Sequence, residues 1–385
     1  MLIVELRQGR EPFNCREDHL VKVLLISKAP RYLSLKPLAG YGQLQLSLIC
    51  PAEFRGERLN FSSCNGVSLF TEKLLFSNSF HFSFYPRLGS LVRELKPDLV
   101  HLDDEPYNVV AFHCAAILNK LRIKYLFVSW QNIFKTYPPP FESMEQYVIK
   151  NAQGAITRNT EARDRLIKKG ARLKIEVIPC GVDLSLYRKK DAVGLKRSLG
   201  LEQCFVVGFC GRLVREKGID ILLEAFAGIG NGCKLLIIGD GPYRQSITRR
   251  IDILKIRDRC VFAGKVSAED MPEYLNCLDC LVLPSVTTSS IKEQFGRVLT
   301  EAMACGVAVI GSSSGEIPNV IGGAGIVFPE KDAGQLRAAL VSLKENQALR
   351  NEYAHKGLRR AAECFSDEVM AEKTYRFYKE IMEER

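Results

Sequence analysis

The sequence predicts an α/β fold with two doubly wound, parallel-sheet domains. Its 385 residues, 46% of them hydrophobic, are more than one core usually organises. Short runs rich in Val, Ile and Leu recur, and a helical pattern follows each one, as in parallel sheets with helices on both faces. This rhythm pauses only once, between residues 183 and 205, so we expect two domains that face a central cleft.

Eight apolar runs are the predicted strands. They are VKVLLIS (21–27), DLVHL (98–102), KYLFVSW (124–130), FVVGFCG (205–211), KLLIIGDG (234–241), CVFAG (260–264), CLVLPS (280–285) and AVIGSS (308–313). Doubly wound sheets bind ligands at the carboxyl ends of their strands, so we expect the motifs that carry chemistry to follow these runs.

The pause sets the domain boundaries. We expect an amino-terminal, acceptor-side domain over residues 1–183, with an arm at 1–20, then a linker over 184–204 and a carboxy-terminal domain over 205–365. A last helix is predicted over 366–385, because Ser366 can cap it and Asp367 suits its positive end. We expect this helix to pack back on the first domain.

Charge and cysteine content limit the class of protein. A formal net charge of +10 attracts anions such as nucleotide phosphates, lipid headgroups or nucleic acid. No apolar stretch approaches the roughly 18 residues of a membrane span, and Glu5 and Arg7 come too early for a secretory signal. Thirteen scattered cysteines favour reduced thiols and hence a cytoplasmic location, and Cys277 and Cys280 lack the second pair of a zinc site.

The segment CGRLVREKGID (210–220) has the features of a diphosphate site. Gly211 ends a predicted strand and a helix begins near Gly218, which places Arg212 and Lys217 beside a helix amino terminus. Free amides, the positive helix end and two cations stabilise the charge of a leaving diphosphate. A glycine turn with two exposed bases is the alternative, and this segment alone leaves both open.

The segment SSIKEQFGRVLTEAMACGVAVIGS (289–312) carries two glutamates. Glu293, in a loop, can accept hydrogen bonds from sugar hydroxyls, while amides around Phe295 and Gly296 reach a diphosphate. Glu301 lies within a helix, where a buried acid needs a polar partner such as ribose hydroxyls. A surface ion pair with Arg297 is the alternative for Glu301.

Together with IIGDGP (237–242), these segments resemble the donor half of the family 4 retaining glycosyltransferases, which have the GT-B fold. The resemblance covers most of residues 175–345. It implies that Glu293 and Glu301 bind the donor sugar and ribose, and that Arg212 and Lys217 hold the diphosphate. The remaining predicted donor-site residues are Gly211, Gly239, Lys265, Phe295 and Gly296.

In the amino-terminal half, PDLVHLDDEPYNVVAFH (97–113) ends a strand in acidic residues and resembles the His-x-His-Glu-Pro segment of that family. Asp104 and Glu105 are candidates for the acceptor side, although helix capping also explains Asp104. The family generally works without a catalytic metal. We therefore expect no metal and no cofactor beyond the nucleotide-sugar co-substrate.

The chain departs from the family pattern in two places. Many members have a histidine facing the donor sugar where this chain has Gln131, in FVSWQNIFKTYPPPF (127–141). Gln131 and Asn132 can hydrogen-bond a sugar hydroxyl or steady an oxocarbenium ion, but they cannot carry a proton. The first loop (27–43) lacks the glycine pair of many relatives, so Lys28 is either an anion contact or part of a basic surface.

These features predict a retaining glycosyltransferase that moves a hexose from a nucleotide-diphosphate sugar, UDP or GDP being favoured, to a saccharide, lipid-linked or small-molecule acceptor. A nucleotide-sugar epimerase of similar fold remains an alternative. The lack of GxGxxG after the first strand argues against a dehydrogenase. Nucleic-acid binding is disfavoured, because the basic runs lack interleaved aromatic residues.

Aromatic residues alternate in SNSFHFSFYPRLGS (77–90), where Phe80, Phe82, Phe84 and Tyr85 lie close together. With the basic surface they would suit peripheral docking on the anionic inner face of a membrane. Their alternation favours a half-buried strand instead.

Overall fold

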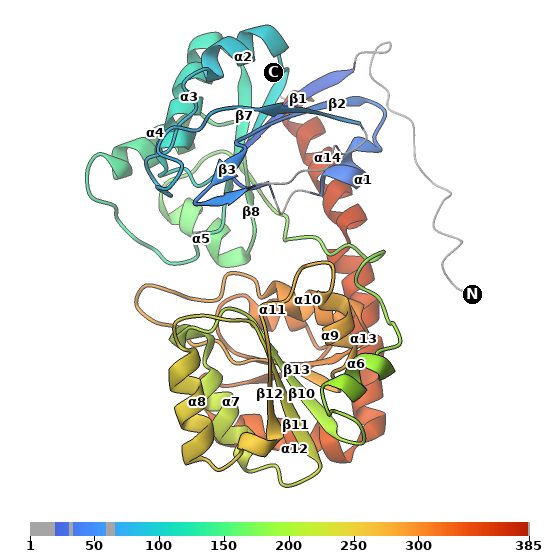
Figure 1. The fold of residues 1–385 in the computed structure, drawn as a ribbon. Helices are drawn as coiled ribbons and strands as arrows, with labels where there is room; N and C mark the ends of the chain where they lie inside the picture. The colour runs from blue at the N-terminus through green and yellow to red at the C-terminus, as the bar shows by residue number, and fades with distance from the viewer. Residues whose placement is uncertain (1–19, 31–33, 59–65, 384–385) are drawn as a thin grey trace.

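The computed structural model contains two large parallel sheets, one in each half of the chain (Figure 1). The structure describes residues 20–30, 34–58 and 66–383. The first sheet has seven strands in the order β5-β2-β1-β6-β7-β8-β9, and the second has six in the order β12-β11-β10-β13-β14-β15. The predicted GT-B architecture is confirmed; the predicted arm lies outside the described residues except for Leu20.

The first sheet contains β1 (Val21–Ser27), β2 (Leu44–Cys50), β5 (Val67–Thr71), β6 (Leu99–Asp103), β7 (Lys124–Ser129), β8 (Gly154–Thr157) and β9 (Lys174–Val177). A small hairpin, β3 (Glu53–Phe54) and β4 (Glu57–Arg58), follows β2. The helices of this half are α1 (Leu35–Ala39), α2 (Leu88–Leu95), α3 (Val109–Leu121), α4 (Phe141–Asn151) and α5 (Thr160–Lys168).

The second sheet contains β10 (Phe205–Cys210), β11 (Cys233–Ile238), β12 (Cys260–Gly264), β13 (Cys280–Leu283), β14 (Ala308–Ser312) and β15 (Ile326–Phe328). Its helices are α6 (Val193–Ser198), α7 (Ile219–Ala227), α8 (Arg244–Ile253), α9 (Met271–Asn276), α10 (Arg297–Ala304), α11 (Ile317–Ile321), α12 (Ala333–Glu345) and α13 (Gln347–Phe365). Two 3₁₀ turns, Arg215–Lys217 and Arg257–Arg259, complete this half, and α14 (Asp367–Glu383) ends the described chain.

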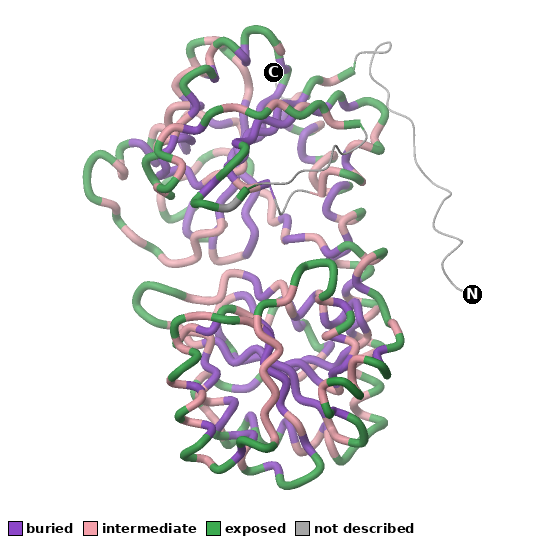
Figure 2. The backbone as a smooth tube through the Cα atoms, viewed as in Figure 1, coloured by how far each residue is buried: buried purple, intermediate pink, exposed green. Residues whose placement is uncertain are grey.

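Helices cover both faces of each sheet, so the central strands are buried on both sides (Figure 2). Adjacent residues of β10 show this, since Val206 packs into the core on one face and Val207 into the core on the other. Strands buried in this way are nearly continuous apolar runs in sequence. Cys277 and Cys280 likewise pack into opposite cores, and each described cysteine is free.

The chain crosses between the two halves twice, and the two crossings lie side by side. The Val182 amide donates to Phe365 O at 2.8 Å, and the Asp367 amide donates to Val182 O at 3.1 Å. A Cβ at Gly181 would lie 2.0 Å from Asp367 Oδ1 and 3.0 Å from Asp367 Cα, so a larger residue there would force Asp367 to shift. In the segment predicted as a linker, Tyr187 and Leu201 are buried in the core of the second half.

After the second crossing, α14 packs on the first sheet and runs beside the upper domain in Figure 1. Lys124 Nζ donates to Ile381 O at 3.0 Å, and Phe377 and Ile381 lie over Gly154, where a Cβ would clash. None of the described helices is both long and apolar enough to cross a membrane.

The favoured strand at Phe80–Tyr85 is wrong. This segment is a loop that carries one isolated bridge, between Leu75 and Phe84. Tyr85 is buried and its Oη donates to Ser27 O at 3.0 Å, whereas the side chain of Phe82 is 55% exposed. The loop folds over the end of β1 because Lys28 Nζ donates to Phe80 O at 2.7 Å.

Candidate active site

The carboxyl ends of strands from both halves meet at one interface. The loops after β7 and β8 contact the loop after β13 and the segment before α11. Asn132 Nδ2 donates to Glu293 O at 3.1 Å, and Lys135 Nζ donates to Ser290 O at 3.2 Å. Thr160 Oγ1 donates to Glu316 Oε2 at 2.9 Å. The two sheets therefore face each other across their ligand-binding edges.

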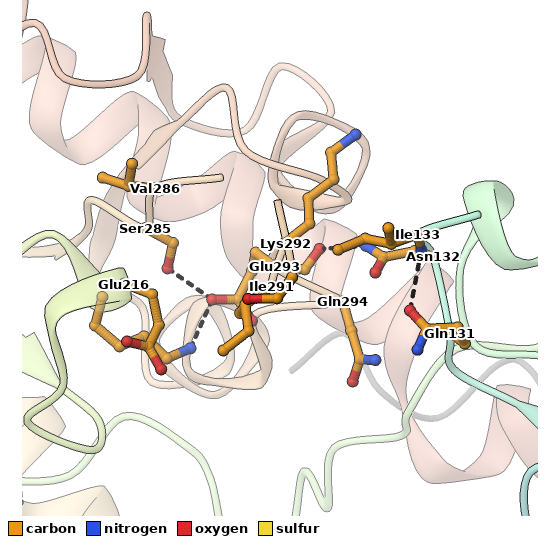
Figure 3. A pocket seen from close by; sticks show the side chains of 12 residues that line it. Gln131, Asn132, Ile133, Glu216, Ser285, Val286, Ile291, Lys292, Glu293 and Gln294 are labelled. Atoms are coloured by element: carbon orange, nitrogen blue, oxygen red, sulfur yellow. Dashed lines mark hydrogen bonds and ion pairs between the residues drawn. The ribbon is translucent and has the colours of Figure 1, made fainter. Parts of the chain in front are cut away.

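A cavity of about 330 Å³ lies at this interface (Figure 3). Both halves of the chain line it, the first through the loop after β7 and the second through the segments after β10 and β13. Its lining includes Gln131, Asn132, Lys217, Ser285, Glu293 and Gln294. Four of these six residues, all but Ser285 and Gln294, were candidates from the sequence.

Glu293 is the central charged group of the cavity. Its Oε2 accepts hydrogen bonds from Lys217 Nζ and from Ser285 Oγ, each at 2.6 Å (Figure 3). The backbone of Glu293 is held from behind by Gly315, which has φ +54° and where a Cβ would lie 1.9 Å from Glu293 O. A positive φ and a contact this close both require glycine. The carboxylate is thus fixed at the cavity wall.

The segment 210–220, which the sequence predicts to bind a diphosphate, forms a tight loop before α7. Gly218 has φ +66°, and a Cβ there would lie 1.9 Å from Pro284 O, which brings this loop against the end of β13. The Val286 amide donates to Glu216 O at 2.8 Å across the same contact. Lys217 therefore reaches Glu293 immediately before the amino end of α7. Arg212 is exposed; its carbonyl accepts from the Val214 amide at 3.0 Å, and its side chain forms no hydrogen bond or ion pair with the described residues.

The strand ends around this loop need glycine too. A Cβ on Gly239 would lie 2.0 Å from Gly211 O, so β10 and β11 end in close backbone contact. The Gly239 amide donates to Gly264 O at 2.7 Å, which aligns the end of β12 with them. Lys265 follows on the exposed surface. None of these residues is among those that line the cavity.

Glu301 lies away from the cavity lining, on α10. Arg297 Nη2 contacts Glu301 Oε1 at 2.9 Å, which is the ion pair considered as an alternative. Burial raises the pKa of Glu301, and the Arg297 guanidinium opposes that rise. The Phe295 ring is buried against Phe365, and Gly296, at φ +82°, begins α10. Phe295 and Gly296 thus offer a ligand their backbone rather than side chains.

The side chains of Lys28 and Asp104 are buried together in the first domain, with Lys28 Nζ 2.9 Å from Asp104 Oδ2. Neither is a lining residue of the cavity. Glu105 is also buried, and its carboxylate binds the chain after β7: Oε1 accepts from the amides of Trp130 and Gln131 at 2.6 and 3.0 Å. Burial raises the pKa of Glu105 to about 7, although the Arg165 guanidinium acts against this rise.

Several residues that shape the interface were not predicted from the sequence. Glu161 forms an ion pair with Lys292 across the interface, and Asn132 Nδ2 also donates to Glu161 at 3.2 Å. Glu316 accepts from Thr160. Lys292 could have been suspected from the sequence because it is next to Glu293. Its partner, Glu161, becomes apparent only in the structure, where the two domains meet. Across the described ranges no cluster of three metal-ligating side chains occurs.

Comparison with known proteins assigns this architecture. The model for "Glycosyl transferases group 1" matches residues 195–360, and the model for "Glycosyltransferase Family 4" matches residues 44–186. A UDP complex of Anabaena HepE superposes with a TM-score of 0.73 at 19% identity, over 94% of this chain and 100% of that chain. Sucrose-phosphate synthase of Thermosynechococcus elongatus gives 0.74 at 19% identity, over 94% and 99% of the two chains.

Two relatives are similar to about half of this chain in sequence. N-acetyl-alpha-D-glucosaminyl L-malate synthase of Bacillus anthracis is 32% identical over 206 residues, which are 52% of this chain and 51% of that protein. D-inositol 3-phosphate glycosyltransferase of Mycobacterium marinum is 29% identical over 222 residues, 54% of this chain and 46% of that protein. The chain spans about half the length of these relatives.

The fold and the cavity at the facing strand ends define a protein of the GT-B class. The two family models together cover both halves of the chain. The chain belongs to the group 1 glycosyltransferases, family 4, and the resemblance read from its motifs is confirmed.

Proposed function

We propose that the chain is a retaining glycosyltransferase that moves a hexose from UDP- or GDP-hexose to an acceptor bound against the first domain. The observation that carries this proposal is the cluster of Glu293, Lys217 and the start of α7 at one cavity lined by both domains. The names of the relatives and the UDP bound by HepE support it. The acceptor, a cytoplasmic location and any peripheral membrane contact remain predictions.

The donor would replace the ion pair between two residues that line the cavity. Lys217 and Glu293 neutralise each other at 2.6 Å, and each has a natural partner in a nucleotide sugar. The diphosphate takes the ammonium group of Lys217, and the sugar hydroxyls take the carboxylate of Glu293. Arg212, which is exposed nearby in sequence, supplies a second cation, and Glu301 is the proposed ribose contact once its bond to Arg297 opens.

Transfer with retention needs charge stabilisation more than proton transfer from the protein. In the proposed front-face route the acceptor hydroxyl attacks the anomeric carbon on the side from which the diphosphate leaves, and a phosphate oxygen takes the hydroxyl proton. The bond to the diphosphate breaks, and the growing charge on its oxygens is stabilised by Lys217, Arg212 and the amino end of α7. These cations take the place of a metal ion.

Gln131 occupies the place at which many members of the family have a histidine, and neither Gln131 nor Asn132 can carry a proton. Gln131 Oε1 accepts from the Ile133 amide at 3.1 Å, which orients its amide group at the cavity. An oriented amide can steady the oxocarbenium ion without exchanging a proton. The interdomain contacts around Asn132 close the cavity against water, which would otherwise hydrolyse the donor.

A donor panel and one matched pair of variants test the proposal. UDP, GDP, ADP, their hexose conjugates and NAD are screened by thermal shift, because a ligand that binds only the folded state raises the Tm. We expect UDP- or GDP-hexose to raise it and to be turned over with release of the nucleotide, unaffected by EDTA. Lys217→Ala should lower turnover by about 100-fold or more, while Lys120→Ala, at an exposed helix position, should not.

The alternatives give different products. An epimerase would convert the sugar without releasing the nucleotide, and a nucleic-acid-binding protein would show salt-dependent retention on DNA without turnover. Normal nucleotide release by the Lys217→Ala variant, or stabilisation by NAD alone, would remove the basis of the proposal.

A further inference from the structure

A chain of polar side chains connects the buried end of β1 to an exposed histidine. Lys28 Nζ lies 2.9 Å from Asp104 Oδ2, and the other carboxylate oxygen, Oδ1, accepts from Asn108 Nδ2. Asn108, which has no exposed surface, then contacts His81 through its Oδ1, 2.7 Å from His81 Nδ1. Three buried residues thus hold the ring of one exposed histidine.

The chemistry of these groups fixes the proton on His81. An ammonium group only donates and an ionised carboxylate only accepts, so the amide nitrogen of Asn108 must face Asp104. The amide oxygen of Asn108 therefore faces His81, and His81 Nδ1 must donate to it. In the neutral ring this leaves the lone pair on Nε2. Nε2 meets no donor among the residues that the structure describes.

His81 lies among aromatic rings at the ligand-binding edge of the first sheet. The Phe80 ring is 5.2 Å from the imidazole and the Tyr107 ring is 5.9 Å from it, between ring centroids. The His81 carbonyl accepts from the Val109 amide at the start of α3, which fixes its backbone at the end of β6. Phe80 and Phe82 are 43% and 55% exposed, so they leave apolar surface beside the imidazole.

A line of rings joins this surface to the cavity. The rings of Tyr107 and Tyr137 lie with their centroids 4.5 Å apart and their planes tilted by 34°, and Gln131 Nε2 approaches Tyr137 Oη at 3.5 Å. Gln131 lines the cavity. His81 is thus on the first-domain side of the proposed donor site, separated from it by two tyrosines.

We propose that His81 is a specificity-determining residue for the acceptor, whose Nε2 accepts a hydrogen bond from a hydroxyl of a polyhydroxylated ring, a pyranose or a cyclitol. The exposed aromatic side chains cover the apolar C–H face of such a ring, while the fixed lone pair takes one of its hydroxyls. Apolar walls with a few oriented polar groups are the usual composition of a small-molecule site. This inference rests on the proposed transferase function and names its acceptor class.

The contact is made away from the reacting hydroxyl, because two tyrosine rings separate His81 from Gln131. His81 therefore contributes to acceptor binding rather than to the chemical step. Its loss should raise the KM for the acceptor and leave kcat at saturating acceptor, and the affinity for the donor, nearly unchanged.

Two substitutions separate recognition from a structural role. In His81→Asn the side-chain amide can still donate to Asn108 from the position of Nδ1, but nothing replaces Nε2. In His81→Gln the amide reaches the position of Nε2, but the bond to Asn108 is lost. If His81 only anchors its loop, His81→Asn should bind the acceptor as the wild type does. If His81 binds the acceptor, His81→Asn should bind the acceptor more weakly than the wild type.

The probes are methyl glycosides of glucose, mannose, galactose and N-acetylglucosamine, with myo-inositol as the cyclitol. Binding to the complex of the full chain with its donor nucleotide is followed by saturation-transfer NMR, and transfer by donor consumption. We expect at least one probe to bind, and His81→Asn to weaken it about 5- to 10-fold, a typical loss for one hydrogen bond. The melting temperature and the nucleotide affinity should be unchanged.

Two results would overturn the inference: no probe binds although the nucleotide does, or the bound probes bind His81→Asn as tightly as the wild type. Response to a glycoside or to myo-inositol distinguishes the two kinds of ring. Failure of the proposed function itself has a separate signature, since no nucleotide would then stabilise the chain.

Discussion

Glu105 shows how a single buried carboxylate shapes this site without lining it. Besides the two amides after β7, it accepts from Ser129 Oγ at 2.9 Å, so its two oxygens take three donors from consecutive residues. The chain before Gln131 is thereby fixed to the end of β6. We infer that Glu105 is a positioning residue that acts through Gln131.

The raised pKa of Glu105 predicts a pH-dependent stability. The carboxyl binds its proton more tightly in the folded state, with a pKa of about 7 against an ordinary value of 4.5. Its contribution to stability is therefore complete below pH 4.5 and is lost as the pH rises through 7. Glu105→Gln removes this titration but keeps an oxygen for the two amides, so the difference in unfolding free energy between variant and wild type should rise between pH 4.5 and 7.5 by roughly 2–3 kcal/mol.

Denaturant unfolding of both proteins at these two pH values measures that difference, and groups that titrate in both proteins cancel. A difference that is constant with pH would show that Glu105 is not the titrating group. If Glu105→Gln keeps Gln131 in place, this variant should bind the nucleotide with unchanged affinity.

The sequence located Glu105 but not its partners. Its place at the end of a predicted strand indicated a ligand group, whereas the structure directs both oxygens to a segment 24 to 26 residues later. Local spacing carries no information about such a pairing. By contrast, Glu293 and Lys217 were singled out from glycine-rich strand ends and helix starts, which are local features, and both line the cavity, as does Gln131.

At the scale of elements, burial decided what could be predicted. The central strands β1 and β10 are buried on both faces, so their apolar runs predicted their bounds almost to the residue. The short strand β8 and the partly exposed edge strands β5 and β9 have no such run and were not predicted. The strand predicted at Phe80–Tyr85 was wrong for a different reason. The alternating aromatic residues there belong to a loop in which Phe82 is exposed and Tyr85 is buried.

The attachment of α14 depends on a buried polar contact. His101 Nδ1 lies 2.6 Å from Tyr378 Oη, and both side chains are buried between the first sheet and α14. Burial and the Arg158 guanidinium lower the pKa of His101 to about 3, so the imidazole is neutral at neutral pH. His101 Nε2 is buried and has no hydrogen-bond partner among the described residues, so removing the hydroxyl leaves both ring nitrogens buried without a partner.

Tyr378→Phe should therefore lower the unfolding free energy by about 1–3 kcal/mol. Tyr375→Phe is the matched control on the same helix, because its hydroxyl bonds Gln43 at 3.2 Å in an exposed position. Urea unfolding of the two variants compares them. Equal losses would mean that the buried contact adds nothing beyond an ordinary surface hydrogen bond.

For the whole molecule, the two adjacent crossings and the contacts between facing loops together define how the domains meet. The crossings at Val182 and Phe365 form one narrow connection (Figure 1), whereas the loop contacts are polar and few. Such a connection permits the domains to open about the crossings, and polar contacts of this kind are easily exchanged with water. In the proposed function, donor entry and product release would need such opening, because the cavity lies between the loops.

The ion pair between Glu161 and Lys292 should favour the closed arrangement. Its side chains are 32% and 28% exposed, so screening limits its worth to about 0.5–1 kcal/mol, or roughly a two- to fivefold shift in the ratio of closed to open forms. Glu161→Gln should consequently enlarge the radius of gyration measured by small-angle X-ray scattering, and added salt should have the same effect on the wild type. Glu202→Gln is the control, since it removes an exposed ion pair with Arg197 that lies within the second half of the chain. If both variants scatter like the wild type at low salt, this pair does not hold the domains together, and closure depends on Asn132 and Thr160.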